Sequence, residues 1–333
     1  MLPDLLSDPF GERSVVLRKS ARLLGANFRF DSNSGELMRL VEWAYKDLPR
    51  HRLPGPVPEL RVSLRLTPHA RRRGRAEPSP IAMISGSGLL GGAAAASNLV
   101  IIAPREHASL VAISPEMLRF PYHSRYELIE FAVFTLAARA QRLVSLHAAC
   151  VGQRGRGLIL IGPTGAGKST IALHCLLDGL DFLSEDSTFV SPGTMFATGV
   201  SNFVHIRADS LAWLGRSRAA TAIRKSPVIQ RRSGVRKFEL DLRRGGFRLA
   251  RTPLKIVGVV LLSSESAGDR PLLKPISRAA MLANFADTQA YGASQPQWRE
   301  FRGNVSRLQP FELRRGNHPI EAVQALRSLL GNR

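Results

Sequence analysis

The chain has 333 residues, 44% of them hydrophobic, which is enough for one large or two modest domains and too apolar for a disordered protein. The formal net charge is +21, from 47 Lys and Arg against 26 Asp and Glu. No apolar run reaches the roughly 18 residues of a membrane-spanning helix, because Glu130 interrupts the nearest candidate, Leu128–Ala138.

The N-terminal residues and the cysteines of the chain bear on its cellular compartment. The N-terminus carries Asp4 and Asp8 rather than a basic stretch before an apolar run, so it does not resemble a secretory signal. Cys150 and Cys175 are too few for a disulfide framework and do not have metal-ligand spacing. These features predict a cytoplasmic protein.

The positive charge raises the question of nucleic acid or an anionic membrane as a partner. Arginine is spread along the whole chain, however, and only seven of the cations are lysine. The densest cluster, Arg71, Arg72, Arg73 and Arg75, lies in a Pro- and Gly-rich stretch without interleaved aromatic residues. A solvated basic loop is therefore favoured over nucleic-acid binding.

Residues 1–122 alternate between strand-like and helical patterns and predict a smaller N-terminal α+β domain. The helix begins at Ser34 and ends before Pro49, with Leu37, Leu40 and Val41 on one face. The small-residue run 86–96 is predicted to be a turn. The predicted strands are 14–17, 27–30, 60–66, the region around Ile81, and 98–103.

Residues 123–333 predict a larger α/β domain of P-loop type. A strongly amphipathic helix is expected over 127–143, followed by mixed short strands and basic loops over 194–250 and a last helix over 320–330. A helix over 169–177 is bounded by Gly179. The predicted strands are 143–151, 158–161, 181–184 and 256–262.

The segment Gly162–Ser169 matches G-x-x-x-x-G-K-[ST] in full, and a predicted strand leads into it and a predicted helix follows. Glycines let backbone N–H groups approach phosphate oxygens, and the helix adds the positive end of its dipole. Lys168 reaches the β- and γ-phosphates in this motif, and the Ser169 hydroxyl binds Mg²⁺. The predicted ATP-binding residues are Gly162, Pro163, Thr164, Gly165, Ala166, Gly167, Lys168, Ser169 and Thr170.

An acidic pair, Glu185 and Asp186, closes the predicted strand 181–184. Ligands of parallel α/β sheets bind at the carboxyl ends of strands, so this pair is expected to face the phosphate loop. One carboxylate would help Ser169 hold Mg²⁺ and the other would accept a proton from an attacking hydroxyl. The residues alone do not assign the two roles. His147, in the strand before the loop, is on the same evidence more typical of a buried core histidine.

Together, Leu146–His147, the loop and Gly179–Asp186 resemble the catalytic core of HPr kinase/phosphorylase and its kinase-like relatives, a family similar in fold to the phosphoenolpyruvate carboxykinases. The resemblance is tight over 147–190 and loose over 125–320. The segment 30–34 is similar to the leading domain of HPr kinase-related proteins, some of which accompany ribosomally made peptides such as lasso peptides and phosphorylate a serine. These likenesses imply a P-loop kinase core with a smaller N-terminal α+β domain, and a homo-oligomer.

The resemblance also implies roles for residues. Lys168 and Ser169 would take the nucleotide phosphates and Mg²⁺, the acidic pair would supply metal binding and the general base, and His147 would lie beside the reacting phosphate. The chain departs from the family with Glu-Asp in place of the usual Asp-Asp, and its segment 199–207 is at most a remnant of a Gly-rich family motif. The resemblance therefore does not extend to phosphorylase activity or to HPr as the substrate.

The expected activity is ATP-dependent phosphate transfer to a hydroxyl, with a serine of a peptide or protein or a small molecule as the acceptor. The donor is left open between ATP, GTP and pyrophosphate. A nucleotide-binding regulatory module with little turnover is the alternative. The chain lacks a Leu-Ser-Gly-Gly-Gln signature, which argues against a transport ATPase, and a nucleic-acid-stimulated ATPase rests on net charge alone. Arg207, Arg236 and Lys237 are candidates to neutralise the transferred phosphoryl group, although surface positions are favoured for them.

Overall fold

The computed structural model describes residues 16–67, 79–94, 98–163 and 165–331. The chain divides into two compact units. The first comprises the described residues up to Ala21, then Phe28–Lys46 and Glu59–Leu136, and the second comprises Arg22–Asn27, Asp47–Pro58 and the chain from Ala137 onward. The predicted domain boundary at 122/123 stays a prediction. None of the described helices is long and apolar enough to span a membrane.

Some sequence predictions lie outside the described residues: Asp4, Asp8, most of the strand 14–17, the arginine cluster 71–75, and Thr164. Within the described part, the strand at the start of the chain covers Leu17–Leu23.

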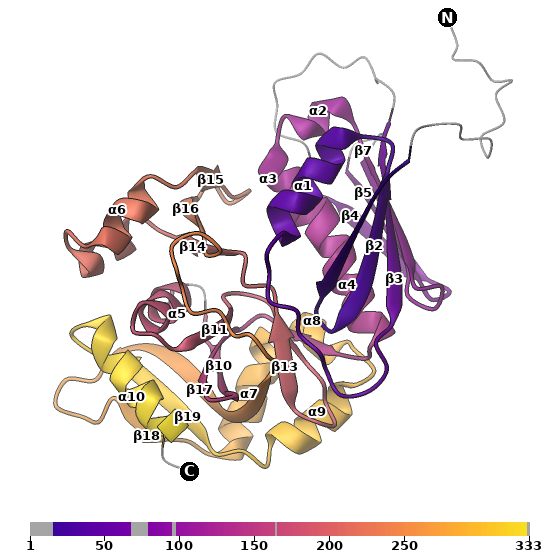
Figure 1. The fold of residues 1–333 in the computed structure, drawn as a ribbon. Helices are drawn as coiled ribbons and strands as arrows, with labels where there is room; N and C mark the ends of the chain where they lie inside the picture. Colours follow the sequence, from indigo (N-terminus) through magenta and orange to yellow (C-terminus); the bar gives the residue numbers. More distant parts are fainter. Residues whose placement is uncertain (1–15, 68–78, 95–97, 164, 332–333) are drawn as a thin grey trace, which may run out of the picture. The chain divides into compact units, whose positions relative to one another are not determined.

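The first unit contains a seven-stranded sheet in the order β1-β2-β3-β7-β6-β5-β4. Helices gather on one face of this sheet in Figure 1. The strands are β1 Leu17–Leu23, β2 Ala26–Ser32, β3 Glu59–Leu66, β4 Ala82–Gly86, β5 Leu89–Ala94, β6 Asn98–Ala103 and β7 Ala108–Ile113. The predicted turn over 86–96 is wrong, because Leu89–Ala94 pairs with both β4 and β6. Close packing bears on one of the glycines there, because a Cβ on Gly92 would lie 2.8 Å from the Ile81 and Met83 side chains.

The helices of the first unit begin with α1, Gly35–Tyr45, where Ser34 accepts hydrogen bonds from two first-turn N–H groups, which confirms the predicted start. The helix predicted over 127–143 begins instead as a π-helix, η1 Ser124–Glu130, and continues as α4 Phe131–Ala140. Arg125 on η1 is fully buried, 3.0 Å from Glu130 and stacked on Trp43 of α1. The short helices are α2 Pro115–Leu118 and α3 Pro121–His123.

The second unit is built on a nine-stranded mixed sheet whose main path runs β11-β9-β10-β17-β13-β12-β8. Off this path, β19 pairs with β17, and β18 pairs with β19. Its strands are β8 Val144–Leu146, β9 Ala149–Gln153, β10 Arg156–Ile161, β11 Asp181–Ser184, β12 Thr188–Val190, β13 Phe196–Gly199, β17 Leu254–Ser266, β18 Leu273–Pro275 and β19 Pro310–Arg315. A separate three-stranded sheet has the order β14-β16-β15, formed by β14 Phe203–Ile206, β15 Val228–Gln230 and β16 Arg236–Asp241.

Two hydrophobic cores lie on the two faces of the nine-stranded sheet. One holds Leu173 and Leu176 of α5 with Val323 and Leu326 of α10, and the other holds Met281, Phe285, Phe301 and Val305 of α7 and α9. The unit is therefore a three-layer α/β arrangement, as Figure 1 shows. Its helices are α5 Lys168–Leu177, η2 Asp209–Leu214 (a 3₁₀-helix), α6 Arg218–Arg224, α7 Arg278–Thr288, α8 Ala290–Ala293, α9 Trp298–Val305 and α10 Pro319–Gly331.

The strand predicted over 143–151 is two strands. β8 pairs with β12, whereas β9 pairs with β10 and β11, so the chain leaves one side of the sheet and joins the other at His147 and Ala148. This break removes His147 from a regular strand and leaves 55% of its side chain exposed. The interpretation of His147 as a buried core residue is therefore wrong.

Candidate active site

Strand directions bring three separated segments to one edge of the nine-stranded sheet. β9 is antiparallel to both β10 and β11, so β10 and β11 run in the same direction on either side of it. The carboxyl ends of β10 and β11 therefore lie at the edge where β9 begins. The loop 162–167 follows β10, Glu185 follows β11, and His147 precedes β9. The expected juxtaposition of the loop and the acidic pair is present in this mixed sheet.

The described residues of the loop after β10 include glycines in conformations that are compatible with phosphate binding. Gly165 and Gly167 have φ of +89° and +90°, which other residues adopt only at a cost in energy. Gly162 is constrained differently, because an added Cβ would lie 2.9 Å from the Leu262 Cβ. Gly167 caps α5 without a side-chain hydrogen bond, whereas a serine caps α1, α2, α6 and α7. The first-turn N–H groups of α5 are therefore not engaged by a capping side chain.

Lys168 and Ser169 both point toward the segments beside the loop. The Ser169 hydroxyl donates to Glu185 Oε1 at 2.6 Å. Lys168 is buried, and its Nζ lies 3.4 Å from His147 Nε2 and 3.4 Å from the Gly162 carbonyl oxygen. The Thr170 hydroxyl instead lies 3.0 Å from the Ser210 hydroxyl of η2.

Asp186 is the more accessible member of the acidic pair. Its Oδ1 lies 3.1 Å from His147 Nδ1, and its Oδ2 lies 3.8 Å from the Arg231 guanidinium. Burial lowers the pKa of His147, as do Lys168 and Arg231, while Asp186 acts in the opposite direction. A neutral His147 can donate from Nδ1 to Asp186 and accept at Nε2 from Lys168, so it bridges the loop lysine and the carboxylate.

Glu185 is held by a buried network. Its Oε2 accepts from the His205 backbone N–H at 2.8 Å and lies 3.1 Å from His205 Nδ1. His205 Nε2 lies 3.1 Å from Glu239, its cross-strand partner on β16. Burial alone would raise the pKa of Glu185, but hydrogen bonds from His205 and Ser169 and the charge of His205 lower it to about 2. Burial alone would lower the pKa of His205, but its hydrogen bonds with Glu185 and Glu239 raise it to about 9.

Two cations, Arg231 and Lys237, accompany the acidic pair. Because successive residues of a strand face opposite sides, Arg236 lies on the other face of β16 from Lys237. Burial, followed by repulsion from Arg231, lowers the pKa of Lys237, while Glu185 and Asp186 oppose this shift. The negative charges of both carboxylates thus act on Lys237. Arg236, the preceding residue on β16, is exposed, and the exposed Arg207 pairs with Asp209 at 3.1 Å.

Gln289, 142 residues along the chain, fixes the backbone at His147. Its Oε1 accepts from the His147 N–H at 2.7 Å, and its Nε2 donates to the His147 carbonyl at 3.2 Å. Gln289 is 3% exposed and follows α7. A buried amide thus replaces the sheet hydrogen bonds that His147 loses at the break between β8 and β9.

Four of these residues were not predicted to belong to the site: His205, Glu239, Arg231 and Gln289. His205 and Glu239 face each other only through the antiparallel register of β14 and β16, which no alternating pattern within either strand indicates. Arg231 and Gln289 lie in no motif, so only the fold brings them to the acidic pair and His147.

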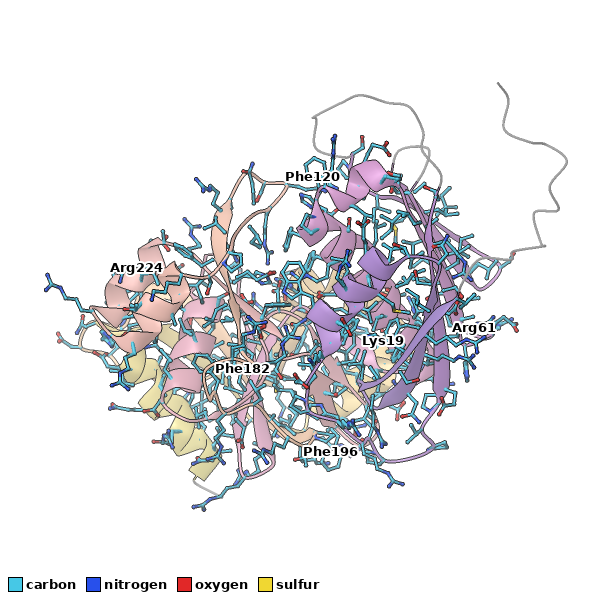
Figure 2. The ribbon with its side chains drawn as sticks, turned by 45° about the horizontal axis from the view of Figure 1, so that its top comes forward. Lys19, Arg61, Phe120, Phe182, Phe196 and Arg224 are labelled. Atoms are coloured by element: carbon cyan, nitrogen blue, oxygen red, sulfur yellow. The ribbon has the colours of Figure 1, made fainter. Side chains whose placement is uncertain are left out.

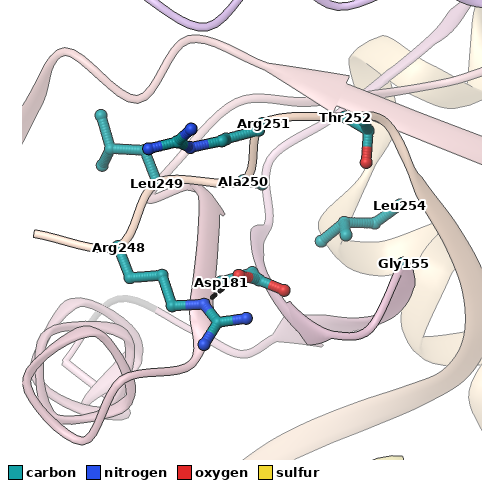
Figure 3. Close-up of a pocket in the computed structure, with 8 residues that line it drawn as sticks. All are labelled: Gly155, Asp181, Arg248, Leu249, Ala250, Arg251, Thr252 and Leu254. Carbon is teal, nitrogen blue, oxygen red and sulfur yellow. Dashed lines mark hydrogen bonds and ion pairs between the residues drawn. The ribbon is translucent and has the colours of Figure 1, made fainter.

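A cavity of about 420 Å³ lies at the other end of β11, away from Glu185. Figure 3 shows its lining, including the pair between Arg248 Nε and Asp181 Oδ1 at 2.6 Å. The lining residues are Gly155, Asp181, Arg248, Leu249, Ala250, Arg251, Thr252 and Leu254. None of the predicted site residues lines this cavity.

Comparisons with known proteins do not assign a function to this chain, so the argument for its function rests on the geometry of the site. No protein-family model and no curated protein matches the chain. A search of solved structures matched the Hpr(Ser) kinase/phosphatase from Coxiella burnetii, with 10% sequence identity, a TM-score of 0.29, and coverage of 55% of this chain and 94% of that chain. A TM-score this low does not establish a common fold. The family resemblance therefore stays a prediction.

Proposed function

We propose that the protein is an ATP-dependent phosphotransferase that phosphorylates a hydroxyl group. One observation carries the proposal: side chains from the loop contact the acidic pair and His147, which other segments supply. Ser169 hydrogen-bonds Glu185, Lys168 lies beside His147, and His147 pairs with Asp186. Phosphoryl transfer needs positioned phosphates, a metal ligand and a base for the acceptor hydroxyl, and these groups match those needs.

The residues fit a nucleotide with Mg²⁺. The loop presents glycines at positive φ and first-turn N–H groups free of a side-chain cap, which suits phosphate oxygens. The Ser169 hydroxyl and the Glu185 carboxylate are hard oxygen donors 2.6 Å apart, which is the donor chemistry that Mg²⁺ prefers. When bound, ATP and Mg²⁺ supply the γ-phosphoryl group and neutralise part of its charge. In this proposal Lys168, Lys237 and Arg231 hold the phosphate oxygens.

The environments of the two carboxylates favour different roles for them. Glu185 is buried, and its low pKa keeps it ionised beside Ser169, so we assign it to the metal. Asp186 is 23% exposed at its side chain and pairs with His147, so we assign it to accept the proton of the acceptor hydroxyl. His147 then orients Asp186 through Nδ1 and holds Lys168 through Nε2.

The test uses γ-labelled ATP, Mg²⁺ and the purified chain, with serine-containing peptides, candidate protein acceptors and free serine offered. Label should move to an acceptor with the wild-type chain. Asp186→Asn should lower kcat by about 10²–10⁴-fold, the usual contribution of a general base, with little change in nucleotide affinity. Lys168→Ala should weaken nucleotide binding itself.

The outcomes separate the proposal from its rivals. Tight nucleotide binding without label transfer to any acceptor would favour the regulatory module over the kinase. If GTP or pyrophosphate bound at a lower concentration than ATP and displaced it, that molecule would replace ATP as the proposed phosphate donor. Equal activity of the wild type and Asp186→Asn would reject Asp186 as the base.

A further inference from the structure

The three-stranded sheet and its helices form a strongly basic part of the second unit, which we call the basic lobe (residues 203–241). It contains nine Lys and Arg but only three Asp and Glu, a net charge of +6 in 39 residues. All three acids are engaged by side chains of the lobe or of the residues directly after it. Glu239 is buried against His205, Asp209 pairs with Arg207, and Asp241 pairs with Arg243 from just beyond β16.

Five further cations of the lobe face solvent. Arg216, Arg218, Arg224, Lys225 and Arg236 are all exposed. Within the described part of the chain, the structure records no ion pair for these five. Four of them lie on or next to α6, and Figure 2 labels Arg224 there among side chains with nitrogen tips that project from the ribbon.

The lobe is joined directly to the candidate active site. His205 on β14 holds Glu185, and Arg231, one residue after β15, pairs with Asp186. The Ser210 hydroxyl of η2 meets Thr170 of α5 at 3.0 Å. The lobe that carries the exposed cations therefore also contributes residues to the candidate site.

We propose that the basic lobe docks the phosphate acceptor, and that the acceptor is an acidic segment of a polypeptide with a serine or threonine among Asp and Glu residues. The inference rests on the proposed function only in naming the ligand as the acceptor. Arginine pairs well with carboxylates because its planar donors match their geometry. Sequence-tolerant binding of single-stranded nucleic acid uses exposed aromatic platforms. In the lobe, Phe203 is buried and Trp213 and Phe238 are half-buried.

The first experiment measures binding in the absence of nucleotide, so it does not depend on kinase activity. Fluorescence anisotropy compares an acidic peptide with a central serine, a neutral peptide of the same length, and a single-stranded oligonucleotide. The lobe variant is Arg218→Gln/Arg224→Gln/Lys225→Gln. The matched control is Lys274→Gln/Arg278→Gln/Arg302→Gln, which removes the same charge from exposed positions elsewhere in the second unit.

The acidic peptide should bind more tightly than the neutral one. The lobe variant should weaken it by about tenfold and the control by less than about twofold, because several exposed ion pairs are lost only in the first. The effect should shrink as salt is raised. Equal weakening in both variants, equal affinity for the two peptides, or tighter binding of the oligonucleotide would overturn the inference.

A second experiment separates this inference from the proposed function. The labelled-ATP assay is run on the acidic and neutral peptides with both variants. A higher kcat/KM for the acidic peptide that only the lobe variant lowers supports docking. Equal kcat/KM for the two peptides rejects docking but retains the kinase. Lobe-dependent binding of the acidic peptide without label transfer retains docking at the lobe and rejects the kinase.

Discussion

His205 holds Glu185 from two directions, with its backbone N–H 2.8 Å and its Nδ1 3.1 Å from the same carboxylate oxygen. The other oxygen of Glu185 accepts from Ser169. His205 is in turn fixed by Glu239 across the β14–β16 pair. The orientation of the proposed metal ligand is therefore set by a residue of the basic lobe, which makes His205 a positioning residue.

Removal of the His205 side chain should loosen Glu185 without affecting the loop. His205→Gln is expected to reduce the Mg²⁺-dependent part of ATP affinity by about tenfold, the usual scale for partners of metal ligands, and to leave ATP affinity in EDTA unchanged. Calorimetric titration with and without Mg²⁺ measures both. Glu239→Gln, which keeps an acceptor for Nε2–H, should lie between this variant and the wild type. Loss of ATP affinity in EDTA would instead indicate a collapsed loop.

The same network should make stability depend on pH. The pKa of His205 is raised from 6.5 to about 9, so its contribution is complete below pH 6.5 and is lost as pH rises through about 9. Breaking a buried ion pair typically costs about 3–5 kcal/mol. Urea unfolding in EDTA should therefore separate the wild type from His205→Gln most clearly near pH 6, and the gap should narrow toward pH 9. A gap that stays constant over this range would contradict the assignment.

Gln289 should matter for catalysis through the backbone of His147. Gln289→Glu keeps an oxygen for the His147 N–H but loses the donor to its carbonyl, and places a carboxylate against that oxygen. We expect kcat to fall by about tenfold, since misplacement of a catalytic group by about 1 Å costs up to 10²-fold, with KM for ATP unchanged.

Gln295→Glu is the matched control for this variant, because Gln295 contacts the Ser145 N–H at 3.4 Å, two residues before His147. It should lower stability but not kcat. A fall in kcat of the same size in both variants would indicate a general effect on β8 rather than the positioning of His147.

Two of the positive-φ glycines of the second unit, Gly155 and Gly167, allow a comparison of strain with ligand binding. An added Cβ meets no atom within 4 Å at Gly167 in the loop or at Gly155 in the turn between β9 and β10, so alanine at either position should cost about 1–2 kcal/mol from backbone strain alone. Only Gly167→Ala should also weaken nucleotide binding, because it alters the cap of α5. Thermal unfolding and ATP titration measure the two effects. Equal ATP affinity in the two variants would argue against nucleotide at this loop.

The sequence by itself identified what is local. The predicted phosphate loop is contiguous, and its strand, glycines and helix obey short-range backbone rules, so the motif Gly162–Ser169 was recognisable without a fold. The acidic pair followed from its place at the end of a predicted strand. The amphipathic helix after Ser34 and the C-terminal helix were recognisable from their periodicity, and both are present.

The tertiary structure decided what depends on pairings between distant segments. The break at His147 arises because β8 and β9 have different partners, and no pattern within 143–151 records that choice. Gln289 reaches His147 across 142 residues, and Glu239 reaches His205 across 34. The sheet also separates two neighbouring cations, since successive residues of β16 face opposite sides: Arg236 is exposed, whereas Lys237 is half-buried and the charges of Glu185 and Asp186 act on it. Sequence therefore determines the local loop motif, whereas long-range strand pairing determines which side chains surround it.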